Sequence, residues 1–264
     1  MKFWRLIRPD TGSISQGDII NGFLDHPYGL PGVECEKCRK TWGGSRIHPF
    51  SCPEKFIKRK ELNNRWPISG KEHYALRKEI EDELFEKYSI QVTLMPGDDF
   101  QPGFLSISGP PKTDVLWSNL SSMCVSERLR KIIEDNNLKG VTFLPINKKK
   151  VGKGKAKKIP LKITEHNREI EIEVDNDNEP NGTYYEMLIT AESKRPPGAE
   201  ITSICNLCGR EEYNDKKRKL IMTEEMWNGE DIFYLSTTLW PIITEKVKNI
   251  FEQNKISNIW IERV

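Results

Sequence analysis

Apolar and polar residues alternate with two different periods along this chain, and each period predicts one kind of element. A period of two predicts β-strands, whereas apolar residues three to four positions apart predict amphipathic helices. The strands predicted in this way cover residues 3–7, 90–94, 115–117, 141–144, 159–163, 168–174 and 184–190. Helices are predicted at 71–88 and 126–136, the second with Ser126 as its N-cap. This order of elements predicts an α+β protein, with mixed or antiparallel sheets and flanking helices.

A segment in the middle of the chain resembles a segment at its C-terminal end. Residues 126–143 align without gaps on residues 244–261, and Asp114–Trp117 corresponds to Asp231–Tyr234 after an adjustment of one residue. Self-similarity of this kind indicates a repeated structural unit. The alternative is chance, since capping and burial impose the same pattern on unrelated helix-strand units. The repeat predicts two related lobes, which we place at residues 1–147 and 159–264.

The segment between these lobes, 148–158, is rich in lysine and contains glycine. Such a composition is typical of a mobile linker or of a long hairpin loop. The segment could contact RNA or an acidic protein, but a solubilising loop explains the same residues. The whole chain carries a net charge of only +2, which is too weak a field to indicate nucleic acid as an obligatory partner.

Two Cys-x-x-Cys pairs, Cys35/Cys38 and Cys205/Cys208, are the strongest chemical signal in the sequence. Two intervening residues let a tight turn direct both sulfurs at one zinc ion about 2.3 Å away, and two such pairs complete a tetrahedron. Because the pairs lie far apart in the sequence, a shared zinc would tie the two lobes together. We therefore predict one structural zinc site with four cysteine ligands.

Besides buried cysteines that bind no metal, two other readings of these cysteines remain open. A local zinc site formed by Cys35, Cys38, His48 and Cys52 also has usable spacing. A thioredoxin-like disulfide oxidoreductase would need a Cys-x-x-Cys pair at the start of a helix, and no clear helix follows either pair. The sixth cysteine, Cys124, lies in an apolar stretch and is expected to be a small core residue.

The motifs of common enzymes are missing from the sequence, so we expect no catalysis. The four histidines form no His-Glu-x-x-His, and no deaminase signature precedes either cysteine pair. The sequence also has no Gly-x-Ser-x-Gly, P-loop or dinucleotide-binding fingerprint. An acidic cluster within 71–88 could contact a basic partner, but the solvated face of a helix is the better explanation; its members are Glu79, Glu81, Asp82, Glu83 and Glu86.

Composition indicates the compartment. Hydrophobic residues make up 36% of the chain and charged residues 30%, as in a globular protein with a well-solvated surface. No apolar run approaches the length of about 18 residues that spans a membrane, and Arg5 and Arg8 interrupt the N-terminal segment where a secretory signal would be apolar. Six cysteines are too few for a disulfide scaffold. We expect a cytoplasmic protein.

Together these segments resemble the double-CXXCG motif family of bacterial immunity proteins. The resemblance covers most of the chain, and it rests on 28–38 with Trp42, on 94–97 with the Pro and Gly turns that precede Asp114–Trp117, on 204–210, and on 231–234 together with 244–264. It departs from the family at Arg39, which stands where the family has glycine. The resemblance implies stoichiometric binding of a cognate toxin in the cytoplasm, without catalysis. The alternative function is a zinc-ribbon protein that binds nucleic acid or regulates through Lys148–Lys158.

Overall fold

The computed structural model describes residues 1–9, 22–63, 66–107, 113–118, 122–148, 159–165, 168–174, 180–214 and 221–264. Within these residues the protein has an α+β fold in which several sheets are flanked by helices, as the sequence predicts. The helices are α1 (Lys60–Asn63), α2 (Gly70–Tyr88), α3 (Glu127–Asp135) and α4 (Glu245–Gln253). Two short 3-10 helices lie at Glu54–Phe56 and Glu224–Met226.

The largest sheet has six strands in the order β10-β11-β15-β12-β9-β2. All neighbours in it are antiparallel except β12 and β9, which are parallel. Its strands are β10 (Val115–Trp117), β11 (Met123–Ser126), β15 (Pro180–Ile189), β12 (Val141–Lys148), β9 (Phe104–Ile107) and β2 (Gly22–Asp25). Helix α3 connects β11 to β12 along the chain.

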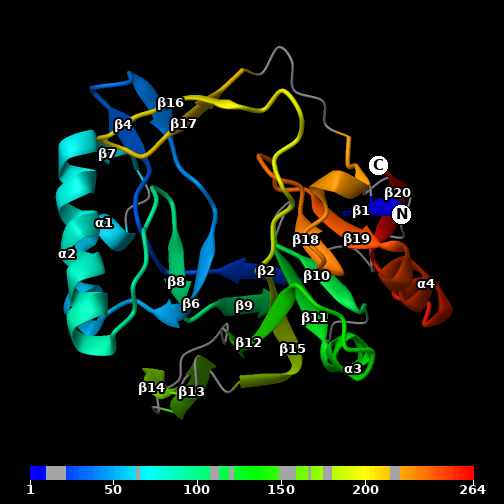
Figure 1. Cartoon of the computed structure of the whole chain (residues 1–264). Coiled ribbons are helices and arrows are strands. Elements are labelled where there is room, and N and C mark those ends of the chain that lie inside the picture. The colour runs from blue at the N-terminus through cyan, green and yellow to red at the C-terminus, as the bar shows by residue number, and fades with distance from the viewer. Residues whose placement is uncertain are drawn as a thin grey trace.

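A second sheet has four antiparallel strands in the order β18-β19-β1-β20. Its strands are β18 (Ile232–Tyr234), β19 (Pro241–Thr244), β1 (Phe3–Ile7) and β20 (Trp260–Arg263). The N-terminal strand thus lies between two C-terminal strands, and both chain ends are found beside this sheet (Figure 1).

The remaining strands form four small sheets. One is β3-β8-β6 and another is β5-β4-β7, whereas β13 with β14 and β16 with β17 are two-stranded. Their bounds are β3 (Tyr28–Gly29), β8 (Asp99–Gln101), β6 (Ile47–Ser51), β5 (Lys40–Trp42), β4 (Val33–Cys35), β7 (Ile68–Ser69), β13 (Ile159–Glu165), β14 (Arg168–Val174), β16 (Ile201–Ile204) and β17 (Glu211–Tyr213).

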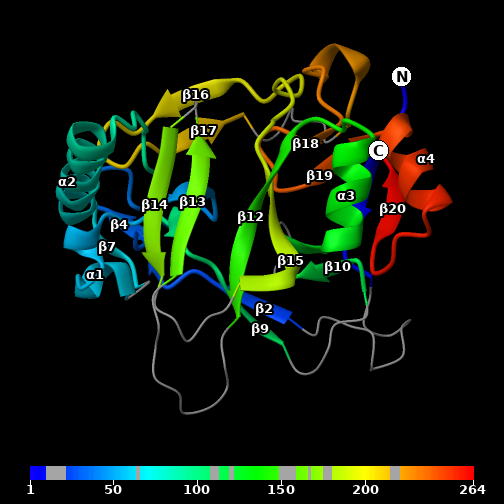
Figure 2. The same ribbon diagram turned by 90° about the horizontal axis from the view of Figure 1, so that it is seen from below.

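The predicted repeat takes the form of two units with the same topology. The first unit consists of β10, β11, α3, β12 and β15, and the second of β18, β19, α4, β20 and β1 (Figures 1 and 2). In each unit a hairpin leads into the helix, and one strand is inserted between the strand before the helix and the strand after it. The registers agree as well. Met187 pairs with Phe143 in the first unit, and Leu6 pairs with Ile261, the residue aligned with Phe143, in the second.

Matching side-chain contacts show that the repeat extends beyond topology. Arg130 lies over the ring of Tyr185 and pairs with Glu134, and the aligned Lys248 lies over the ring of Trp4 and pairs with Glu252. Asn136 and the aligned Asn254 each donate a side-chain hydrogen bond of 2.8 Å to a carbonyl of their own helix. Capping and burial alone do not require these tertiary pairs, so they favour a true repeat over chance similarity.

The two units are joined by a reciprocal contact. Asp114 of the first unit accepts hydrogen bonds from Ser126 Oγ at the start of α3 and from the backbone N–H of Ser257 in the second unit. Asp231 of the second unit accepts them from Thr244 Oγ1 and from the backbone N–H of Lys139, which aligns with Ser257. Each aspartate therefore supports its own helix start and the loop of the other unit.

One hydrophobic core lies between the units. It takes buried residues from both hairpins, both helices and both inserted strands, among them Trp117, Ile133, Leu6 and Phe251. A second core lies under α2 and includes Phe56, Ile80 and Phe100. Burial of each of these side chains contributes about 2 kcal/mol.

Strand pairing links the two sides of the predicted boundary at 148–158 twice, because β1 pairs with β19 and β20 and β15 pairs with β11 and β12. The division into lobes at this segment stays a prediction. Asn147 and Lys148 end β12, and the rest of the lysine-rich segment lies outside the described residues.

The strand predicted at 90–94 is wrong. This segment follows α2 in an irregular conformation and is held to that helix instead of a sheet. The N–H of Ile90 donates to Leu84 O, and the N–H of Leu94 donates to the carboxylate of Glu81. Alternating apolar residues indicate only that one side of a segment is buried. Here that side packs into the core under α2 and not against a neighbouring strand.

Helix α2 confirms the helix predicted at 71–88. Ser69 and Glu72 form a capping box at its start, and Ser89 ends it in a left-handed conformation. Four acidic residues of this helix are paired with basic side chains, in the ion pairs of Arg77 with Glu81, Lys78 with Asp82, Lys87 with Glu83, and Arg59 with Glu79. These pairs are what a solvated helix face is expected to show.

Candidate metal centre

Each Cys-x-x-Cys pair lies at the tip of a β-hairpin. The first knuckle hairpin is formed by β4 and β5, and the second by β16 and β17. In both, the residue after the second cysteine donates its N–H to the carbonyl of the first cysteine. The N···O distance is 2.7 Å from Arg39 to Cys35 and 2.8 Å from Gly209 to Cys205. The two tips therefore share one backbone conformation, which places both sulfurs of a pair on the same side.

The two hairpins bring all four cysteine sulfurs together, as the sequence predicts for a shared site. The Sγ atoms of Cys35, Cys38, Cys205 and Cys208 all lie within 4.8 Å of one another. The distance from Cys35 to Cys205 is 3.7 Å, and so is that from Cys38 to Cys208. A tetrahedral ion with four metal–sulfur bonds of about 2.3 Å has sulfurs about 3.8 Å apart. All four thiols are free of disulfides, so the donor set fits a metal ion.

The four sulfurs have both apolar neighbours and a hydrogen-bond donor. Cys35 and Cys208 are buried with Val33, and Leu207 packs against them. The indole N–H of Trp42 points at Cys208 Sγ at 3.4 Å. A donor beside a metal-bound thiolate stabilises its negative charge and fixes the ligand's orientation.

The protein environment separates the pKa values of the second pair. Burial alone raises the pKa of Cys205, but the backbone N–H groups of Cys208 and Leu207 outweigh it and lower that pKa to about 7. Burial raises the pKa of Cys208 to about 12. One thiol of the pair thus ionises readily and the other resists ionisation, so a bound cation would have to favour its thiolate.

Both hairpins are fastened to each other and to the start of α2. Lys37 Nζ of the first hairpin donates to Asn206 Oδ1 of the second at 2.5 Å. Glu36 accepts the N–H of Gly70, the first residue of α2, at 2.8 Å. A Cβ at Gly70 would lie 2.7 Å from Glu36 Oε2 and 2.9 Å from Leu207 Cδ2, so a side chain at this position would have to displace the ends of one side chain from each hairpin. The metal site is therefore part of the packing around α2.

Arg39 adopts the left-handed conformation that the second hairpin gives to glycine, with φ of 56° against 75° at Gly209. This conformation costs a residue with a Cβ about 1–2 kcal/mol. Arg39→Gly would relieve this cost, but glycine also makes the unfolded chain more flexible, which offsets part of the gain. We therefore predict that Arg39→Gly raises the free energy of unfolding by about 1 kcal/mol. Urea unfolding of the variant and the unaltered protein in the same buffer measures this. Gly209→Ala is the matched variant and should destabilise by a similar amount; stabilisation by Gly209→Ala, or destabilisation by Arg39→Gly, would contradict the assignment.

The two further residues of the alternative local site, His48 and Cys52, do not belong to the group of four sulfurs. His48 is buried, and its Nε2 contacts Asp98 Oδ2 at 2.8 Å. The same carboxylate oxygen accepts from Arg46 and from the N–H of Met95. Cys52 lies in the core under α2, and burial raises the pKa of its thiol to about 12. Cys124 is a buried residue of β11, as predicted.

His73 on α2 is a buried histidine without a hydrogen-bond partner on either ring nitrogen among the described residues. Burial, together with the charge of Arg77, lowers its pKa to about 4. The unfolded chain then binds more protons than the folded one between about pH 6.5 and pH 4. Stability should therefore fall as the pH drops through this window, by about 3 kcal/mol from this residue.

Replacing His73 by Leu should remove this part of the acid sensitivity while leaving stability at pH 7 similar or higher, because a buried polar group without partners is costly. The test compares urea unfolding of the two proteins from pH 7 to pH 4.5. Both carry the same cysteines, so the difference between the two profiles isolates His73. Parallel profiles would show that this histidine is not buried in the neutral form.

Sequence reasoning identified the four cysteines but not the residues that support them. Trp42, Glu36 and the Lys37–Asn206 contact depend on how two hairpins and a helix meet, and no local pattern encodes that. One signal was available: Trp42 stands four positions after Cys38 on the returning strand of the hairpin, opposite Val33. An aromatic donor at that place is positioned to reach a sulfur.

The described part of the chain contains no helix that is both long and apolar enough to cross a membrane. Among the described residues the four cysteines form the one group of three or more metal-binding side chains. Comparisons of the chain with models of protein families and with curated proteins returned no match. The chemistry of the candidate site therefore rests on its own geometry: two Cys-x-x-Cys hairpins that place four thiols at metal-binding distance.

Proposed function

We propose that the four cysteines bind one zinc ion and that the protein is an immunity protein, which binds and neutralises a cognate bacterial toxin in the cytoplasm. The observation that carries the proposal is the cluster of Cys35, Cys38, Cys205 and Cys208 within 4.8 Å. These are the cysteines on which the resemblance to the double-CXXCG family rests. Four thiolates in a tetrahedron favour zinc over harder ions such as Mg²⁺ and Ca²⁺.

A zinc ion with four cysteine ligands has a structural role, because no coordination position is left for water or substrate. The ligands here join hairpins that are far apart in sequence and fasten both to α2. The zinc ion would therefore hold together the part of the fold that contains the second core. Recognition of a toxin then falls to exposed surface elsewhere, where shape and charge complementarity select the partner.

The function is tested by searching the reading frames next to this gene for one that encodes a toxin domain, which the proposal expects to be there, and by expressing that domain. Expression of that domain alone should stop growth of the host, and co-expression of this chain should restore it. The purified pair should elute as a complex with one copy of each protein, and the toxin released from it should be chemically unchanged. A matched control is Cys124→Ala, which alters a buried cysteine away from the cluster and should protect fully.

Two results would oppose the proposal. If growth is not restored and no complex forms, the chain is not the immunity protein of that toxin. If a small amount of the chain inactivates an excess of toxin, or leaves it covalently modified, the protein acts as an enzyme. Tight binding to generic RNA with a steep dependence on salt would instead support the zinc-ribbon alternative.

A further inference from the structure

The four thiols of the candidate metal centre differ in their exposure to solvent. Cys35 of the first knuckle hairpin and Cys208 of the second are buried, whereas Cys38 and Cys205 are partly exposed. Two sulfur–sulfur contacts of 3.7 Å run between the hairpins, and each joins a partly exposed thiol to a buried one: Cys205 to Cys35, and Cys38 to Cys208. Because the reaction of a thiol depends on access, an oxidant would reach one member of each contact first.

Contacts that do not involve sulfur also hold the two hairpins together. Lys37 Nζ at the tip of the first hairpin donates to Asn206 Oδ1 at the tip of the second, at 2.5 Å. Both hairpins also contact Gly70 at the start of α2. Glu36 accepts the N–H of Gly70, and Leu207 lies so close that a Cβ there would be 2.9 Å from its Cδ2. These contacts would keep the sulfurs opposite one another after a metal ion leaves.

A disulfide across the hairpins needs only a small movement of the sulfurs. A sulfur–sulfur bond is about 2.05 Å long, so each sulfur of a 3.7 Å contact would move by about 0.8 Å. Rotation of the two side chains can supply such a shift, and each disulfide would join the same hairpins that the metal ion joins. A disulfide between the two cysteines of one hairpin would close only its own tip and leave the hairpins unlinked.

We propose that the four-cysteine cluster is a site of reversible oxidation by hydroperoxides, which replaces the metal ion by two disulfides between the hairpins, Cys38–Cys208 and Cys35–Cys205. The proposal rests on the proposed function in one respect, since it takes zinc to be the ion that is replaced. The link between the hairpins would then persist in both redox states, through zinc when the thiols are reduced and through disulfides when they are oxidised.

The reaction balances with hydrogen peroxide as the oxidant. The thiolate of Cys38 attacks one peroxide oxygen and the O–O bond breaks, which yields a sulfenic acid and a hydroxide ion. The thiolate of Cys208 then attacks the sulfenic sulfur, which forms the disulfide and releases a second hydroxide ion. One peroxide thus takes up the two electrons that two thiolates lose. With two ligands gone the tetrahedron is open and Zn²⁺ leaves, and Cys205 and Cys35 react with a second peroxide in the same way.

The test treats the zinc-loaded protein with hydrogen peroxide and follows the released zinc with a chromogenic chelator. Free thiols are then blocked with N-ethylmaleimide, and the protein is digested with trypsin and chymotrypsin. Trypsin cuts after Lys37, between the cysteines of the first pair, and chymotrypsin cuts after Leu207, between those of the second. The four cysteines thus end on different peptides, and mass spectrometry identifies each disulfide.

The expected result is the release of one zinc ion for two peroxides consumed, with the peptide of Cys38 linked to that of Cys208 and the peptide of Cys35 linked to that of Cys205. Dithiothreitol and zinc should then restore the original mass and zinc content. Disulfides within the two pairs would overturn the proposal. Zinc retained in excess peroxide, or oxidation to sulfinic acids that dithiothreitol does not reverse, would also overturn it.

Two double variants test the pairing without zinc. Cys38→Ser with Cys208→Ser keeps Cys35 and Cys205, a pair across the hairpins, whereas Cys205→Ser with Cys208→Ser keeps the pair of the first hairpin. The first variant should form its disulfide about tenfold faster at the same peroxide concentration, because its two sulfurs are in contact and one of them is partly exposed. Equal rates, or a faster reaction within the single hairpin, would overturn the proposed pairing.

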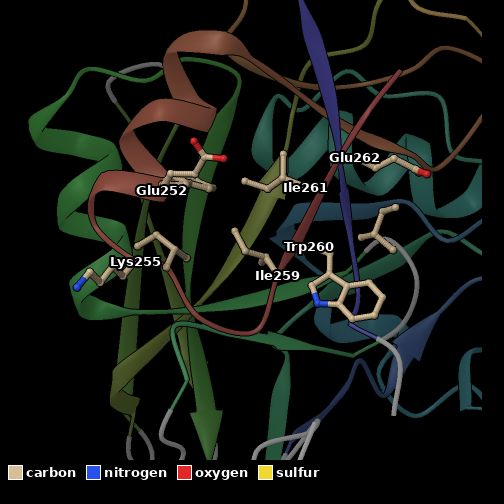
Figure 3. A pocket seen from close by; sticks show the side chains of 9 residues that line it. Glu252, Lys255, Ile259, Trp260, Ile261 and Glu262 are labelled. Atoms are coloured by element: carbon tan, nitrogen blue, oxygen red, sulfur yellow. The ribbon is translucent and has the colours of Figure 1, made fainter. Parts of the chain in front are cut away.

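The oxidised protein should keep its fold, with a melting temperature close to that of the zinc form and above that of the reduced, metal-free protein. Amide NMR signals at the hollow between α4 and β20, around Lys255 and Trp260 (Figure 3), provide an internal control. These elements lie on the opposite side of the molecule from the knuckle hairpins (Figures 1 and 2). Oxidation should shift the signals of residues 33–42 and 203–211 but not those at the hollow. An oxidised protein that melts with the metal-free one would overturn the proposal.

Failure of this proposal can be told apart from failure of the proposed function. If peroxide forms disulfides within the pairs while the reduced protein binds zinc and neutralises the toxin, only this proposal fails. If the protein binds no zinc, the zinc part of the proposed function fails, and the disulfides of the peroxide-treated, metal-free protein still decide the pairing. If the chain binds no toxin, the immunity function fails whatever the disulfides show.

Discussion

Replacing Cys205 by Ser should abolish zinc binding and lower the free energy of unfolding by about 4 kcal/mol, which is the stabilisation that a ligand gives at about 1,000 times its dissociation constant. The expected loss is large because this cysteine belongs to a cluster that joins two segments 170 positions apart, and the remaining three thiols no longer close the tetrahedron. Zinc content by elemental analysis and urea unfolding should change together.

The chain provides its own control for this experiment. Cys124 is as buried as the two innermost ligands but lies in β11, away from the cluster. Cys124→Ala should therefore keep one zinc ion per chain and lose about 1 kcal/mol through a small cavity. Full zinc occupancy in the Cys205→Ser protein would refute the shared site, and loss of zinc from Cys124→Ala would show that zinc binding reports only on general stability.

Replacing Asp114 by Ala should lower the free energy of unfolding by about 3 kcal/mol, the scale of breaking a buried charged network. Its carboxylate accepts hydrogen bonds from Ser126 and from Ser257, and it pairs with Arg128 at 2.8 Å. Burial alone raises the pKa of Asp114, but the contacts from Ser257 and Arg128 outweigh it and lower that pKa. The contribution is thus present above the ordinary pKa of an aspartate and is lost as the pH falls through the lowered value.

The repeat supplies a matched comparison. Asp231 makes the equivalent contacts in the second unit, but its cation, Lys246, lies 3.5 Å away and its carboxylate is more exposed. Asp231→Ala should therefore destabilise in the same direction by less, and Asp135→Ala, at an exposed position of α3, should change little. Differential scanning calorimetry or urea unfolding measures all three. A larger effect at Asp135 than at Asp114 would contradict the reciprocal contact.

Periodicity predicted the long elements well, because a long amphipathic segment repeats its signal. Helices α2 and α3 and strand β1 lie where apolar spacing and Ser126 place them. Short strands of two or three residues, such as β7 and β8, carry too few positions for a period to be seen. Their pairing is fixed by the chain that packs on them, and this is also why the segment at 90–94 has the alternation of a strand without being one.

The candidate site shows the same division between local and tertiary information. Cysteine spacing identified all four members of the cluster, because metal chemistry requires a particular residue type at a particular interval. The capping residues at the start of α2 were also local. The contact of Glu36 with Gly70 and that of Trp42 with Cys208 join segments that only the fold brings together. Likewise, the inserted strand β15 follows its unit along the chain, whereas the inserted strand β1 precedes its unit. The alignment of 126–143 with 244–261 includes neither of these strands, so it could not predict the insertion.

The most direct test of the shared zinc site is X-ray absorption spectroscopy at the zinc edge on the purified protein, with elemental analysis of the same sample. The account predicts one zinc ion per chain, surrounded by four sulfur atoms at about 2.3 Å and by no nitrogen or oxygen. Three sulfurs and one nitrogen at about 2.0 Å, as a site with Cys35, Cys38, Cys52 and His48 would give, would contradict it.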